Sequence, residues 1–200
     1  MGRNDAELIR KSRDGDADAF GDLVLRYQNR IFATVYRILG NSEDAREMAQ
    51  EAFFRAWSKL DTFREGARFS TWLYTITLNL TRSELRKRKT RRHIRPVSLQ
   101  VKFGEDEGRT MEPPSGDDGP LEVIGKAELH QLALNEIDRL EPEAREVVVL
   151  RDMQELSYEE IAEVLACPLG TVRSRLHRAR EQLRDRLSPL LEASRKGGVA

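Results

Sequence analysis

Apolar residues recur every three or four positions along most of the chain, and this spacing is that of an amphipathic α-helix. The pattern predicts helices over residues 5–14, 17–39, 43–60, 70–89, 121–140 and 142–150, followed by a pair of helices that begins at Tyr158. Gly40 and Asn41 are predicted to end the second helix and Ser42 to cap the third. Alternation typical of a strand is confined to 97–103, which either docks as an extended segment or belongs to a linker. The predicted fold class is therefore all-α.

The segment 156–181 has the sequence pattern of a helix-turn-helix. Ser157 followed by Glu160 has the spacing of a capping box, which predicts that the first helix begins at Tyr158. Residues 166–169 interrupt the apolar pattern and form the turn. The apolar stripe of the second helix consists of Val172, Leu176, Ala179 and Leu183. A capped short helix, a turn and a basic second helix together predict a DNA-binding unit.

The polar face of the second helix carries residue types that recognise DNA. Its exposed side is predicted to present Arg173, Ser174, His177, Arg178 and Glu181. A helix fits the major groove, where Arg pairs with guanine O6 and N7 and Ser donates or accepts a hydrogen bond. Arg175 and Arg180 lie further round the helix, where contacts to phosphates position a protein without reading sequence. For any single Arg, a solvated surface position is an equally good interpretation, and only the whole unit favours DNA binding.

Two predicted helices of the N-terminal half have unusual polar faces. Phe54 stands among charged residues on the outer face of the third helix, which is typical of a contact surface. On the fourth helix, aromatic, amide and basic side chains are interleaved, which suits stacking on unpaired bases beside phosphate neutralisation. Its outward residues are predicted to be Tyr74, Thr75, Asn79, Arg82, Arg86 and Lys87. Phe69 and Trp72 have the alternative interpretation of ordinary core aromatics.

The 34 basic side chains balance 34 acidic ones, so net charge indicates nothing about a partner, whereas the distribution of charge along the chain does. The stretch 82–95 holds eight basic residues against only Glu84, whereas 105–122 holds seven acidic residues against only Arg109. The first stretch indicates a polyanion-binding face and the second a solvated linker. We therefore expect a helical domain over 1–95, a flexible acidic linker over 96–120 and a helix-turn-helix domain over 121–200.

The sequence carries no pattern of catalytic or metal chemistry. Cys167 stands alone, which excludes an intrachain disulfide; it is interpreted as a packing residue of the turn, with a redox role as the alternative. The three histidines, at 93, 130 and 177, lack ligand spacing, and there is no glycine-rich phosphate loop. We expect no enzyme activity, no cofactor and no metal. The first residues lack the apolar core of a signal peptide and no stretch is long enough to span a bilayer, which predicts a cytoplasmic protein.

Three segments together resemble the extracytoplasmic-function (ECF) sigma factors of bacterial RNA polymerase. They are DAREMAQEAFFRAW at 44–57, FREGARFSTWLYTITLN at 63–79, and LSYEEIAEVLACPLGTVRSRLHRARE at 156–181. The resemblance covers nearly the whole chain. It implies two sigma domains, one for core polymerase and the −10 promoter element and one for the −35 element. The implied function is that of an alternative sigma factor, which directs polymerase to promoters and helps to open the DNA.

The same resemblance implies roles for particular residues. Binding to the clamp helices of the polymerase β′ subunit is expected from Asp44, Met48, Gln50, Glu51, Phe54 and Arg55. Recognition and opening of the −10 element is expected from Arg64, Arg68, Phe69, Trp72, Asn79, Arg82 and Arg86. Reading of the −35 element is expected from Thr171, Arg173, Ser174, Arg175, His177 and Arg178. The polymerase β-flap is expected to contact the C-terminal domain at residues that the sequence does not identify.

The resemblance also implies an anti-sigma factor as a partner, which in this family is often bound to the inner face of the membrane and holds the sigma factor there. Two other interpretations stay open from the residues alone. One is a stand-alone, dimeric helix-turn-helix regulator that uses only 156–181, although 17–89 lacks the strand–helix alternation of a receiver domain. The other is a nonspecific RNA- or DNA-binding helical protein built on 82–95, which leaves the helix-turn-helix unexplained.

Overall fold

The computed structural model describes residues 4–64, 66–94 and 120–197, and every regular element in these ranges is helical. The N-terminal half contains α1 (Asp5–Arg13), α2 (Ala17–Leu39), α3 (Ser42–Ser58), the 3₁₀ turn η1 (Leu60–Thr62) and α4 (Phe69–Ile94). The C-terminal half contains α5 (Pro120–Asp138), α6 (Pro142–Val148), the π-helical turn η2 (Val149–Met153), α7 (Tyr158–Leu165) and α8 (Leu169–Gly197). The all-α prediction is confirmed for this part of the chain, and the predicted linker lies outside it except for Pro120.

The apolar stripes of α1 to α4 form the core of the N-terminal half. α2 contacts α1, α3 and α4, and α3 also contacts α4. The most deeply buried side chains include Leu8, Leu23, Ile31, Val35 and Leu73. Because these positions repeat with the period of a helix, the sequence pattern decides which face of each helix turns inward.

The helix ends of this half follow local capping chemistry. Gly40 ends α2 in the left-handed conformation, at φ 70°, as predicted. The prediction that Ser42 caps α3 is wrong, because Asn41 Oδ1 accepts a hydrogen bond from the Asp44 N–H at 3.0 Å and Ser42 is the first helical residue. Asn and Ser cap helices about equally well, so the sequence left this boundary ambiguous by one position.

α7 and α8 form the predicted helix-turn-helix. The capping box is complete, because the Glu160 N–H donates to Ser157 Oγ at 3.1 Å and the Ser157 N–H donates to Glu160 Oε2 at 2.8 Å. The predicted stripe residues Val172, Leu176 and Ala179 are buried. α8 contains Pro189 in its interior and continues to Gly197. Proline removes one helical hydrogen bond, and this loss alone does not fix the end of a long helix.

Removal of the α7 cap is expected to destabilise the protein measurably. The substitution Ser157→Ala deprives the Glu160 N–H of its acceptor and should lower the free energy of unfolding by about 1 kcal/mol. Urea denaturation followed by circular dichroism measures this loss. Ser42→Ala is a matched control, since the α3 cap is Asn41, and it should change the free energy by less than about 0.5 kcal/mol. Equal losses in the two variants would contradict the capping assignment.

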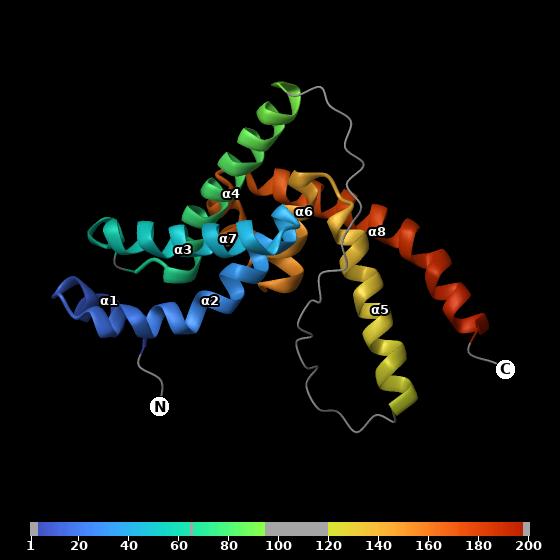
Figure 1. Ribbon diagram of the computed structural model, residues 1–200, viewed down its shortest axis with the longest axis horizontal. Coiled ribbons are helices and arrows are strands. Elements are labelled where there is room, and N and C mark those ends of the chain that lie inside the picture. The colour runs from blue at the N-terminus through green and yellow to red at the C-terminus, as the bar shows by residue number, and fades with distance from the viewer. Residues whose placement is uncertain (1–3, 65, 95–119, 198–200) are drawn as a thin grey trace.

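The two halves pack against each other. α4 contacts α7, and α2 contacts α5, α6 and η2. Figure 1 shows α4 beside α7 near the centre of the molecule, with α5 and α8 extending away from α1 and α3. This packing decides which of the predicted site residues are accessible.

Candidate functional site

The exposed face of α8 brings four of the predicted DNA-reading side chains together. Those that the structure leaves exposed are Arg173, Ser174, His177 and Arg178. Neither Arg173 nor Arg178 forms an ion pair with any residue that the structure describes. His177 Nε2 lies 3.5 Å from Glu181 Oε1, one turn along the helix. Thr171 is half-buried and its carbonyl oxygen accepts a hydrogen bond from Ser174 Oγ at 3.1 Å.

Two other arginines of α8 are engaged by the protein itself. Arg175 pairs with Glu143 of α6, and Arg180 pairs with Asp152 of η2. These ion pairs connect α8 to α6 and η2 and help to hold its exposed face in position. Arg175, which was predicted to contact DNA, therefore already has an acidic partner.

An aromatic cluster supports the loop between η1 and α4. Phe69 is 3% exposed, and its ring centroid lies 5.9 Å from that of Phe63, 5.5 Å from that of Tyr27 and 5.8 Å from that of Trp72. Phe69 is thus a core aromatic, in agreement with the alternative interpretation, and its ring is not open to a base in this structure. Trp72 is half-buried.

A cavity of about 560 Å³ lies between α1 and this loop. It is lined from the loop by Phe63, Gly66, Ala67, Arg68, Phe69 and Ser70, and from the N-terminal segment by Asn4, Asp5, Ala6, Ile9, Arg10 and Arg13. Arg13 Nη2 donates to the carbonyl oxygen of Leu60 at 3.1 Å and to that of Phe63, which fixes the start of the loop. The sequence pattern indicated the loop but not α1, because a contact between such distant positions leaves no local pattern.

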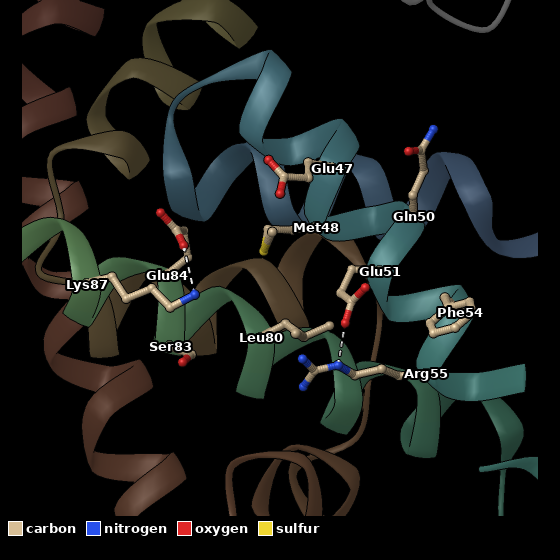
Figure 2. A pocket seen from close by; sticks show the side chains of 10 residues that line it. All are labelled: Glu47, Met48, Gln50, Glu51, Phe54, Arg55, Leu80, Ser83, Glu84 and Lys87. Atoms are coloured by element: carbon tan, nitrogen blue, oxygen red, sulfur yellow. Dashed lines mark hydrogen bonds and ion pairs between the residues drawn. The ribbon is translucent and has the colours of Figure 1, made fainter. Parts of the chain in front are cut away.

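A groove of about 410 Å³ lies between α3 and α4 (Figure 2). Five of the six residues predicted to bind polymerase line it, namely Met48, Gln50, Glu51, Phe54 and Arg55. The remaining lining residues were not predicted from the sequence, and they are Glu47, Leu80, Ser83, Glu84 and Lys87. Asp44, the sixth predicted residue, pairs with Arg88 of α4.

Phe54 supplies the large exposed apolar side chain of this groove. It is 66% exposed. Arg55 Nε lies 2.7 Å from Glu51 Oε1, and Lys87 Nζ lies 3.7 Å from Glu84 Oε2 on the opposite wall. Figure 2 shows these two ion pairs on facing helices, with Phe54 beside the first. An aromatic anchor rimmed by charged groups is typical of a protein-binding surface.

The C-terminal half covers part of the α4 surface that was predicted to face outward. Tyr74 is 1% exposed, so its predicted outward position is wrong, and its hydroxyl donates to Gln154 Oε1 at 2.8 Å. Burial raises the pKa of Tyr74 to about 12. Arg82 donates from Nε and Nη2 to the two carboxylate oxygens of Glu146, at 2.8 and 2.6 Å. The helical period of the sequence identifies side chains that point away from the core of their own half. It does not reveal that the other half of the chain covers them.

A second charged contact joins the two halves at the start of α4. Arg68 Nη1 lies 2.9 Å from Glu160 Oε1, and Thr71 Oγ1 lies 3.4 Å from the same oxygen. Burial would raise the pKa of Glu160, but the hydrogen bond from Ser157 and the Arg68 charge outweigh it and lower this pKa. The five polar residues among the seven predicted −10 residues thus fall into two groups. Arg68 and Arg82 contact acidic partners, whereas the side chains exposed outside these contacts are Arg64, Asn79 and Arg86.

The described residues were also compared with the requirements of a metal site and of a membrane-spanning helix. Among the residues that it describes, no group of three or more His, Cys, Asp and Glu side chains has the arrangement of a metal site. None of the described helices is both long and apolar enough to cross a bilayer. Cys167 is a half-buried free thiol in the turn between α7 and α8.

Comparison with known proteins matches both halves of the chain. The Sigma-70 region 2 family model matches residues 23–91, and the Sigma-70, region 4 model matches residues 130–183. The chain is 40% identical over 184 residues to the ECF RNA polymerase sigma factor SigW of Bacillus subtilis (strain 168), covering 91% of this chain and 96% of that protein. It is 37% identical over 191 residues to the ECF RNA polymerase sigma-E factor of Escherichia coli (strain K12), covering 94% and 96%.

The fold is likewise similar to that of a solved protein. The sigma factor RpoE from Bartonella quintana, in its co-crystal structure with the anti-sigma factor NepR, superimposes with a TM-score of 0.65 at 26% identity, over 84% of this chain and 96% of that chain.

Proposed function

Because the chain belongs to the ECF family of RNA polymerase sigma factors, we propose which of its surfaces contact promoter DNA and which contact polymerase. It is an alternative sigma factor and not an enzyme: it binds core RNA polymerase, directs it to promoters through their −10 and −35 elements, and helps to open the DNA. The stand-alone regulator is thereby excluded. We assign the polymerase and −10 functions to residues 1–95, with a linker over 96–120, and the −35 function to residues 121–200.

The exposed face of α8 is proposed to read the −35 element. The observation that supports this is the exposure of Arg173, Ser174, His177 and Arg178 on one helix, where neither arginine pairs with an acidic side chain of the described residues. Arg173 and Arg178 are proposed to bind guanine edges in the major groove, with Ser174 and His177 beside them. Thr171 and Arg175 are proposed to contact the phosphate backbone, which requires Arg175 to leave Glu143.

Arg173→Ala is the substitution that tests base reading at the −35 element. Loss of a bidentate contact to guanine is expected to weaken holoenzyme binding to the promoter by about 1–3 kcal/mol and to relax the preference at one base pair. Competition binding against a set of single-base −35 variants measures both effects. Arg184→Ala, which removes an exposed arginine further along α8, should preserve the preference. An equal loss on every promoter variant would contradict direct reading by Arg173.

The cavity between α1 and the η1–α4 loop is proposed to receive an unpaired base of the −10 element. A flipped base loses a few kcal/mol of stacking, which an enclosing pocket offsets. Trp72 is proposed to stack on the strand, and Phe69 to support the pocket from within the core. The remaining proposed contacts, to phosphates and base edges, are Arg64, Arg68, Asn79, Arg82 and Arg86. This assignment gives α1 a place at the −10 site.

The groove between α3 and α4 is proposed to bind the clamp helices of the polymerase β′ subunit. The exposed ring of Phe54 supports this assignment, because aromatic anchors contribute a large share of binding energy at such contacts. Glu51, Arg55, Glu84 and Lys87 supply a charged rim, which favours one orientation of the partner. Met48, Gln50 and Asp44 complete the proposed surface.

We also propose a cytoplasmic location and control by an anti-sigma factor. The relative from Bartonella quintana was solved with such a factor, NepR, and its fold is similar to that of this chain. A membrane-bound anti-sigma factor would hold this protein at the inner face of the membrane. The β-flap of polymerase is proposed to contact the C-terminal domain.

A further inference from the structure

The proposed strand-binding face of α4 lies against the C-terminal half of the protein. Arg68, Thr71, Tyr74 and Arg82 all contact residues that follow the linker. Their partners come from three consecutive elements, since Glu146 belongs to α6, Gln154 follows η2 and Glu160 belongs to α7. The C-terminal half therefore engages two residues, Arg68 and Arg82, that the proposed function assigns to DNA.

Two of these partners are carboxylates that occupy guanidinium groups. Glu146 is 2% exposed and holds Arg82 through two parallel hydrogen bonds. Glu160 holds Arg68, whose side chain remains largely exposed, through one hydrogen bond of 2.9 Å. A carboxylate and a phosphate offer a guanidinium the same pair of oxygen acceptors. Each of these arginines can therefore bind its own carboxylate or a DNA phosphate, but not both in the same geometry.

Buried apolar side chains of both halves belong to one hydrophobic cluster, and beside it lie polar contacts that are imperfectly satisfied. Arg37 Nη1 lies 3.3 Å from Asp138 Oδ2, and Arg145 Nη1 donates to the Ile38 carbonyl oxygen at 3.1 Å. Within the described part of the chain, the buried atoms Asp138 Oδ1 and Arg145 Nε have no hydrogen-bond partner. Buried polar atoms without partners are unfavourable, so they weaken the contact that the apolar cluster makes between the halves.

DNA geometry requires the two halves to separate when both promoter elements are read. α4 packs on α7 and α7 packs on α8, and packed helix axes lie about 8–10 Å apart, so α8 lies within roughly 20 Å of α4. The −10 and −35 elements are centred roughly 25 base pairs apart, which is about 85 Å along B-form DNA. One closed molecule cannot reach both.

We propose that Glu146 and Glu160 form a latch that closes the free protein, and that Arg82 and Arg68 exchange these carboxylates for DNA phosphates when the protein opens. The C-terminal domain then acts as an internal competitor of the −10 strand. The latch rests on the proposed DNA role of α4, whereas the closed arrangement itself rests on the contacts between the two halves.

The test compares charge-neutral variants of the latch in the full-length chain. Glu160→Gln removes one carboxylate and keeps the capping box, in which Gln serves as well as Glu. The double variant Glu146→Gln with Glu160→Gln removes both. Glu159→Gln is the matched control, because Glu159 is an exposed neighbour on α7. Spin labels at Gln28→Cys on α2 and Gln182→Cys on α8, in a Cys167→Ser background, report the distance between the halves. A fluorescent oligothymidylate reports strand binding.

The double variant is expected to show a new population at longer distances and to bind oligothymidylate on the order of tenfold more tightly, because more molecules are open. Glu160→Gln should show a smaller change in the same direction, and Glu159→Gln none. If the folded double variant has the same distance distribution as the parent chain, the latch is overturned. Longer distances with unchanged affinity would overturn the exchange of carboxylate for phosphate. If the distances lengthen and no chain binds the oligonucleotide, the latch stands and the proposed strand-binding face is wrong.

Discussion

Phe54→Asp is expected to weaken binding of the chain to core RNA polymerase by about 2–4 kcal/mol, or roughly 30- to 1,000-fold. Phe54 is 66% exposed at the edge of the groove between α3 and α4, so little stability depends on its ring and its apolar surface is free for a partner. A carboxylate at this position removes the aromatic anchor and brings a charge into the contact. Titration of labelled chain with sigma-free core polymerase, followed by fluorescence anisotropy, measures the dissociation constant.

Leu25→Asp is the matched control for this prediction. Leu25 is 68% exposed on α2 and does not line the groove, so it presents a similar apolar side chain elsewhere on the same half. Its substitution should leave polymerase binding within about twofold, which is less than 0.5 kcal/mol. Unchanged binding of Phe54→Asp, or an equal loss in both variants, would refute the assignment of this groove to polymerase.

Phe69→Ala is expected to lower the free energy of unfolding by about 3–5 kcal/mol. The Phe69 ring lies at the centre of the aromatic cluster with Phe63, Tyr27 and Trp72, so truncation leaves a cavity beneath the η1–α4 loop. Urea denaturation followed by tryptophan fluorescence reports this loss directly, because Trp72 belongs to the cluster.

Phe54→Ala is the control for Phe69→Ala, because it removes a phenylalanine ring that does not belong to the core. Its ring is exposed, and the expected change in stability is within about 0.5 kcal/mol. If Phe69→Ala unfolds at the same urea concentration as the parent chain and yet fails to open promoters, Phe69 contacts DNA and the core role assigned to it is wrong.

Local structure could be predicted from the sequence because its determinants are local. The capping box of Ser157 and Glu160, the terminating Gly40 and the stripe Val172–Leu176–Ala179 each act within a few residues, and the structure bears all three out. The α3 cap was misplaced because Asn41 and Ser42 are adjacent and chemically equivalent as caps.

Contacts between distant segments could not be predicted in this way. The α3 wall of the groove follows from one helical face, whereas Leu80 and Lys87 join it only because α4 packs beside α3. α1 reaches the loop through Arg13, which is about 50 positions away from Phe63. Tyr74 was predicted to be exposed because its partner, Gln154, lies in the other half of the chain. These residues complete the candidate sites, and their positions depend on tertiary packing.

Transcription with purified components tests whether this chain acts as an alternative sigma factor. The chain is added to sigma-free core RNA polymerase and sheared genomic DNA of the source organism, and the 5′ ends of the transcripts are mapped. We expect discrete start sites that share one pair of upstream motifs and are absent without the chain. Failure of folded, inhibitor-free protein to bind polymerase or to produce such start sites would show that the chain does not act as a sigma factor.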